Sequence, residues 1–175
     1  MGQHPGEILG VHFKSLVASF PTAAVREPEF RRKVDAMQPD GWYSWQLYID
    51  MSHKLTSGIP HDAVVRVGKN NILRAKSVFV QQGFTAAEQI LEDWGRVWNA
   101  NLRGTLPSDL IVTHSYRPGS VVIAAGVAHV PGLIEGYMAG FVEAYGGRVT
   151  SCTRRASERD PKLQLYAMQW QSKNG

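Results

Sequence analysis

The stretch that decides the fold is DLIVTHSYRPGSVVIAAGVAHVPGLIEGYMAGFVEAYGGRVTSCTRRASERDPKLQLYAMQWQ, residues 109–171. It opens with two runs of strand-forming residues, separated by the turn signal Pro118-Gly119. Pro131 then begins a helical pattern that Gly146-Gly147 ends, and two more strand-like runs follow. The pattern predicts strands at 109–117 and 120–127, a helix at 131–145, and strands at 148–155 and 163–170. We expect this ββαββ unit to form a four-stranded antiparallel sheet.

About a hundred residues of helical pattern precede this unit. Their apolar residues recur at helical spacing, and proline or glycine separates the runs. The pattern predicts about five helices and no strand before the sheet. We therefore expect an α+β fold and a single domain over residues 1–175, with a helical subdomain at 1–104 and a ββαββ subdomain at 105–175. The helices are expected at 7–20, 28–37 and 42–55, from Pro60 as far as Phe79, and from Thr85 as far as Trp98.

Two of these helices carry local signals of their own. The fifth begins with Thr85-Ala86-Ala87-Glu88, a capping box in which Thr85 accepts from the N3 amide and Glu88 reaches back. The fourth contains Gly68-Lys69-Asn70-Asn71, which we expect to be an irregularity and not a phosphate-binding loop, because the rest of that motif is missing.

Composition limits the classes of function. The chain has 175 residues, 43% of them hydrophobic and 19% charged, with a net charge of +4. The positive charge is mostly scattered, whereas nucleic-acid modules usually gather it in one stripe. Cys152 is the only cysteine, so no disulfide can form within the chain. The first residues do not show the pattern of a signal peptide, and no apolar run reaches about 18 residues, so we expect neither a secretory leader nor a membrane span. We expect a cytoplasmic protein without nucleic-acid or membrane partners.

Aromatic and polar residues at the expected junction of helices and sheet are the candidate site. Trp94 and Trp98 share one helical face, and His114 is expected to share a strand face with Tyr116. Such residues usually belong to a core. The functional alternative is the wall of an apolar cavity, in which a few polar tips orient a planar ligand. The predicted ligand-binding residues are Trp94, Trp98, His114, Tyr116, Tyr137 and Met138.

The chain resembles a known superfamily in the order of its elements and in two local stretches. Those stretches are LIVTHSY at 110–116 and AGFVEAYGGRV at 139–149. The chain resembles heme-nitric-oxide/oxygen-binding domains and the related regulatory domains named after vinyl reductases, and within that plan it is most similar to uncharacterised bacterial proteins. The resemblance implies helices followed by a ββαββ sheet. It also implies a sensor that binds a small molecule.

The chain departs from the heme-binding members at the residues that hold the heme. The resemblance implies a proximal histidine on the helix before the sheet, but residues 94–102, WGRVWNANL, contain none. It also implies a Tyr-x-Ser-x-Arg motif for the propionates, and residues 115–120, SYRPGS, hold those residue types in another order. Heme is therefore possible but disfavoured, and the sequence does not identify a cofactor. The cysteine-based metal sites of the vinyl-reductase-like domains need more than one cysteine.

The sequence predicts a non-catalytic bacterial sensor or regulatory domain that binds a small, largely apolar ligand between helices and sheet. No nucleophile elbow is present and no histidine pair has HExxH spacing, so we expect no enzyme. One alternative is a homodimeric protein-interaction module without a ligand. Another is a heme-based gas sensor with an unexpected ligand such as His114 or His53.

Overall fold

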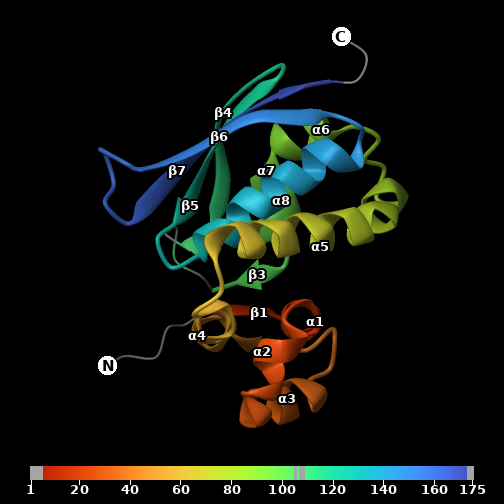
Figure 1. The fold of residues 1–175 in the computed structure, drawn as a ribbon, viewed down its shortest axis with the longest axis vertical. Helices are drawn as coiled ribbons and strands as arrows, with labels where there is room; N and C mark the ends of the chain where they lie inside the picture. Colours follow the sequence, from red (N-terminus) through yellow and green to blue (C-terminus); the bar gives the residue numbers. More distant parts are fainter. Residues whose placement is uncertain (1–5, 105, 107–108, 173–175) are drawn as a thin grey trace.

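The computed structural model describes residues 6–104, 106 and 109–172 (Figure 1). One end of the molecule holds β1 (Glu7–Leu9), α1 (Gly10–Ser19), α2 (Pro21–Val25), α3 (Pro28–Asp35), β2 (Trp42–Ser44) and α4 (Trp45–Thr56). The long helix α5 (His61–Gln81) leads to α6 (Ala87–Leu91), α7 (Trp94–Asn99) and β3 (Leu102–Arg103). The other end holds β4 (Ile111–Arg117), β5 (Ser120–Gly126), α8 (Pro131–Ala144), β6 (Arg148–Ala156) and β7 (Leu163–Gln171).

The last five elements confirm the predicted ββαββ unit and the α+β class. Their four strands form one antiparallel sheet in the order β4-β5-β7-β6. Helices α6, α7 and α8 lie on one face of this sheet (Figure 1). Both faces of β5 are largely buried, as expected of a central strand, and its inward residues Val121, Ile123 and Ala125 pack into the core beneath α8.

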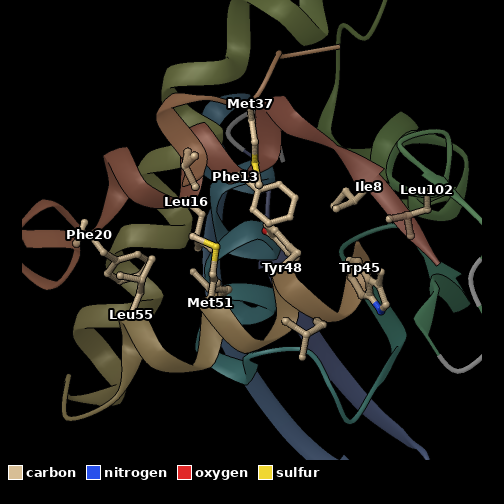
Figure 2. Packing of buried hydrophobic residues seen from close by; sticks show 14 of the residues in the cluster. Ile8, Phe13, Leu16, Phe20, Met37, Trp45, Tyr48, Met51, Leu55 and Leu102 are labelled. Atoms are coloured by element: carbon tan, nitrogen blue, oxygen red, sulfur yellow. The ribbon is translucent and has the colours of Figure 1, made fainter. Parts of the chain in front are cut away.

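Two hydrophobic clusters divide the interior. The first fills the end formed by α1–α4, with Phe13, Trp45 and Met51 fully buried at its centre (Figure 2). The second lies between the four-stranded sheet and helices α6, α7 and α8. Trp98 and Tyr137 pack against both clusters, so they mark where the clusters meet. The expected subdomain boundary at residue 104 stays a prediction, but α6 and α7 pack with the sheet.

Glycines bring α5 and α8 into unusually close contact. Gly132, Gly136 and Gly140 recur every fourth residue and so share one face of α8. Opposite Gly136 lies Gly68 of α5, which a Cβ on Gly136 would approach to 2.9 Å. Helix α5 runs unbroken through residues 68–71, so the expected irregularity there is wrong. The absence of a side chain at Gly68 serves helix packing.

Short strands in the first part of the chain correct the expectation of helices alone. β1 pairs with β2 and β3 in a small antiparallel sheet. Arg103, on β3, contacts both other strands of this sheet. Its Nε donates to Glu7 Oε2 of β1 at 2.6 Å, and its guanidinium lies 4.4 Å from the ring centroid of Trp42 on β2. The spacing of Trp42 and Trp45 mimics a helix, but α4 begins only after Ser44, whose Oγ accepts from the Leu47 amide at 3.3 Å.

The predicted fifth helix is two helices, because a side chain from the sheet divides it. The Thr113 hydroxyl donates to the Leu91 carbonyl at 2.8 Å and accepts from the Trp94 amide at 3.2 Å. Asp93 caps α7 by accepting from the Arg96 amide at 3.2 Å.

The predicted capping box is wrong in both of its residues. The N-cap of α6 is Ala86 and not Thr85, and the side chain that reaches back is Gln89 and not Glu88. Gln89 Oε1 accepts from the amides of Thr85 and Ala86 at 2.7 and 3.2 Å.

A β-bulge corrects the predicted faces of β4. Thr113 pairs with Ile123 and Ser115 pairs with Val122, so His114 is an extra residue without a register partner. Ile111 is buried, and Val112 and His114 are exposed. The expectation that His114 and Tyr116 share an inward face is therefore wrong. An extra residue shifts the alternation by one position, which strict period-two counting cannot anticipate.

Candidate functional site

A cavity of about 300 Å³ lies where the two hydrophobic clusters meet. Its walls come from α1, α5, α7 and α8, together with Gln82, which follows α5 directly, and Asn101, which lies two residues after the end of α7. We call this space the central cavity. The expected pocket between helices and sheet is thus displaced, since the described lining residues belong to helices or follow them. They are Val11, His12, Ser15, Asn71, Ile72, Ala75, Val78, Phe79, Gln82, Trp94, Val97, Trp98, Asn101, Tyr137 and Phe141.

The central cavity has an apolar floor and an accessible rim. Trp94 and Phe141 are each 2% exposed and meet edge to face, with ring centroids 5.5 Å apart. On the rim, Val11 is 45% and Val78 49% exposed. The rim therefore opens between α1 and the second half of α5. A volume of about 300 Å³ is at the lower limit of small-molecule sites.

Two ring nitrogens of the lining residues are buried without a partner among the described residues. They are Nε2 of His12 and Nε1 of Trp98. The two rings meet edge to face, with centroids 5.4 Å apart. Buried polar groups in proteins are nearly always hydrogen-bonded. Two unpartnered nitrogens on neighbouring rings therefore need an explanation.

Burial keeps the ionisable groups of the central cavity uncharged. It lowers the pKa of His12 below its usual 6.5, and the neighbouring Asn101 side chain offsets this only in part, so the imidazole is mainly neutral at pH 7. Burial also raises the pKa of Tyr137 to about 12, against smaller opposing effects of Tyr48 and Asn71. Within the described lining there is no Lys, Arg, Asp or Glu.

The structure brings together three of the six predicted site residues. Trp94, Trp98 and Tyr137 line the central cavity. Met138 is fully buried in the second hydrophobic cluster. Tyr116 packs near Trp170, with ring centroids 6.5 Å apart, and His114 is exposed as the extra residue of the bulge.

Sequence reasoning missed His12. It lies on α1 one position before the core residue Phe13, and its polarity in an otherwise apolar helical run was the available signal. Only the contact of α1 with α7 shows that its ring faces Trp98.

The central cavity does not fit a heme held as the resemblance implies. The wall formed by α7 presents Trp94 and Trp98 where the resemblance implies a histidine. Propionates need cationic partners when buried, and the described lining supplies none. His114 and His53 are exposed, and His53 Nε2 lies 2.8 Å from the Ala128 carbonyl oxygen. His12 is the one histidine of the described lining.

The rest of the described chain offers no metal centre. No group of three or more His, Cys, Asp or Glu residues that could hold an ion occurs among the residues described here. Cys152 is an exposed residue of β6. Partial desolvation of its sulfur by neighbouring atoms, with a smaller contribution from the charge of Glu135, raises the pKa of its thiol to about 11, and a thiol with a raised pKa is a poor nucleophile near neutral pH. Within residues 6–104, 106 and 109–172, no helix has the length and apolarity to span a bilayer.

Comparisons with known proteins show the fold and not the family. No protein-family model matches the chain, and no curated protein does. An alanine-to-glycine mutant of the H-NOX protein from K. algicida, in the Fe(II) unliganded state, superimposes with a TM-score of 0.63 over 95% of this chain and 98% of that chain, at 9% identity. The unsubstituted K. algicida protein gives 0.57 over 94% and 97%, at 8% identity.

A third solved structure has the same fold as this chain. It is the NMR structure of a histidine-to-glycine mutant of the Shewanella oneidensis H-NOX domain in the Fe(II)CO ligation state, with a TM-score of 0.56 over 93% of this chain and 98% of that chain, at 11% identity. The chain therefore has an H-NOX-like fold over nearly its whole length.

Proposed function

We propose that this chain is a non-catalytic sensor or regulatory domain that binds a small, largely apolar molecule in the central cavity. The observation that carries the proposal is the position of that cavity. Its walls combine His12 of α1, from the first end of the molecule, with Phe141 of α8, which packs on the sheet. A ligand in the cavity contacts both ends of the molecule. If it binds one relative arrangement of the two ends more tightly than another, it shifts the population toward the arrangement that it binds better.

The similarity of the fold to solved H-NOX structures also supports the proposal. The structural neighbours of the chain are H-NOX proteins, two of them in the Fe(II) unliganded state and one in the Fe(II)CO state. A sensor built on this fold without their iron chemistry needs a different ligand. The apolar lining, rich in aromatic rings, favours a small organic molecule. Homodimer formation and a protein partner stay predictions.

Native mass spectrometry of gently purified protein is the direct test. We expect a retained small molecule, seen as added mass on the folded chain and lost on denaturation. The same spectrum reports the oligomeric state. If the folded chain carries no added mass and takes up no small apolar compound from a screened set, the central cavity is only a packing defect.

Truncating the aromatic wall is expected to release the retained molecule. Trp98→Ala removes an indole that lines the central cavity, and we expect it to lower the retained fraction at least about tenfold, the effect of losing roughly 1.4 kcal/mol of apolar contact. The matched control is Trp170→Ala, which removes a buried indole outside that cavity. Both variants are compared at temperatures of equal folded fraction. Equal losses from the two variants would contradict a site at α7.

Hemin titration separates this proposal from heme sensing. We expect the protein to stay without a shifted Soret band at one equivalent of hemin, because the described lining has no cation for the propionates. Absorption spectra of the wild-type chain and the His12→Phe variant provide the measurement. A sharp Soret band in the wild type that His12→Phe abolishes would establish heme ligation by His12 instead.

A further inference from the structure

The unpartnered ring nitrogens specify the chemistry of the ligand more closely than the apolar walls do. Indole Nε1–H is only a donor, whereas a neutral imidazole Nε2 is a donor or an acceptor according to its tautomer. A buried donor or acceptor that is left without a partner costs about 1–3 kcal/mol. His12 Nε2 and Trp98 Nε1 both carry this cost in the described residues, on rings whose centroids are 5.4 Å apart. One head group of a ligand is therefore able to lie near both rings.

The charge of the ligand follows from the polar residues around it. The polar side chains of the described lining are neutral: Ser15, Asn71, Gln82, Asn101 and Tyr137 accompany His12 and Trp98. Burial holds His12 mainly in its neutral form. A carboxylate or phosphate brought into such a site would lose its hydration without gaining an opposite charge. An anionic ligand is thus excluded by the same residues that accept an apolar one.

We propose that the ligand is an uncharged, largely apolar molecule with one oxygen head group, a carbonyl or a hydroxyl, that accepts from Trp98 Nε1–H and contacts His12 Nε2. This rests on the proposed function of the central cavity. A carbonyl oxygen accepts from Trp98, and it accepts from His12 as well in the tautomer that carries the proton on Nε2. A hydroxyl accepts from Trp98 and either accepts from or donates to His12, whose tautomer adjusts.

A trapped water is the competing explanation for Trp98. This residue also lines a second space of about 10 Å³, together with His129 and Tyr48, which is barely the size of one water. His12 does not line that space, so such a water leaves the imidazole unexplained. The two explanations differ in what happens when the indole N–H is removed.

Size-matched probes test the head group. Propylbenzene has none, propiophenone places a carbonyl on nearly the same skeleton, and 3-phenylpropanoate carries a carboxylate. Dissociation constants of the three are measured by ligand-observed NMR or calorimetry for the full chain, for Trp98→Phe and His12→Phe, and for Trp170→Phe as a buried indole outside the central cavity. Circular dichroism verifies that each variant is folded.

We expect Trp98→Phe to weaken propiophenone binding about fivefold, the effect of one neutral hydrogen bond, and to change propylbenzene binding less than about twofold. His12→Phe should act in the same direction, Trp170→Phe should change neither, and 3-phenylpropanoate should not bind. Comparing variants cancels the difference in hydration between the probes.

Three outcomes overturn the head-group assignment. Equal effects of Trp98→Phe on propiophenone and propylbenzene show that the site is apolar only, as a water on the indole would give; the proposed function then still stands. Preferred binding of 3-phenylpropanoate shows an anion site and likewise leaves a ligand site in place. Failure of all three probes to bind the wild-type chain removes both the head group and, at this size of molecule, the proposed site.

Discussion

Replacing Gly136 with alanine is expected to lower the free energy of unfolding by about 2–4 kcal/mol, at the upper end of overpacking effects. A Cβ at this position would lie 2.3 Å from the Val65 carbonyl oxygen and 2.9 Å from Gly68 Cα. Both are backbone atoms of α5, so no side-chain rotation relieves the clash, and the helices must separate. Alanine's better helix propensity, about 1 kcal/mol, offsets only part of the cost.

Gly132→Ala is the matched control for this substitution. It lies on the same face of α8, but its nearest atoms are the Cβ and Cγ1 of Val64 at 3.0 Å, so a movement of a few tenths of an ångström makes room for the new methyl group. Urea unfolding followed by circular dichroism measures both variants. We expect Gly136→Ala to be clearly less stable than Gly132→Ala. The stability of Gly140→Ala should fall between the two, because its Cβ would lie 2.7 Å from Ile72 Cβ and 2.9 Å from the Lys69 carbonyl oxygen. A Gly136→Ala variant as stable as Gly132→Ala would contradict close α5–α8 packing as the cause.

This packing also bears on the proposed function. Helix α5 supplies Ile72 and Phe79 to the wall of the central cavity, and α8 supplies Tyr137 and Phe141. A change in the spacing of the two helices therefore changes the width of the cavity. A folded Gly136→Ala variant should bind propiophenone differently from the wild type even though position 136 does not line the cavity.

Acidification below about pH 6.5 is expected to destabilise the protein through His129. This side chain is 5% exposed, and its Nε2 donates to the Asp109 carbonyl oxygen at 2.8 Å. Its ring meets Trp45 edge to face, with centroids 5.4 Å apart. Burial lowers its pKa to about 4; Asp109 opposes this shift through its hydrogen bond and charge, whereas the nearby His53 adds to it.

The sign follows from proton linkage. The unfolded chain, with a histidine pKa near 6.5, binds a proton more readily than the folded chain does at about 4. The stability linked to a neutral His129 is therefore complete above about pH 6.5 and falls as the pH approaches 4. Its full size is about 3 kcal/mol, from a difference of roughly 2.5 in pKa.

Unfolding free energies measured from pH 7.5 to 4 test this expectation. The difference between the wild type and His129→Gln isolates the contribution of His129 from that of the carboxyl groups, and this difference should shrink as the pH falls. Replacement of the exposed His114 by glutamine should leave the acid dependence of the wild type in place, because His129 is still present. Parallel pH curves for the wild type and His129→Gln would show that His129 does not control the acid transition.

Sequence determined the sheet end of the molecule because its signals are local. The turn at Pro118-Gly119 and the stop at Gly146-Gly147 separate elements that form from their own residues, and the observed bounds of β5, α8, β6 and β7 differ from the expected ones by at most about one residue. The aromatic face of residues 94–98 likewise predicted part of the cavity wall, since helical spacing brings Trp94 and Trp98 to one side.

Tertiary structure alone decided the features that depend on partners distant in sequence. The hydroxyl of Thr113, on β4, divides α6 from α7. No residue within the run that forms these two helices predicts the break. The small sheet formed by β1, β2 and β3 arises only because strands far apart in the chain meet. The bulge that exposes His114 is likewise a matter of pairing with β5. His12 becomes a candidate only because its ring meets that of Trp98, from α7, at the wall of the central cavity. The periodicity of a sequence shows which face of a helix or strand is apolar. Long-range packing decides which of these faces meet, and which polar atoms remain without a partner at the contact.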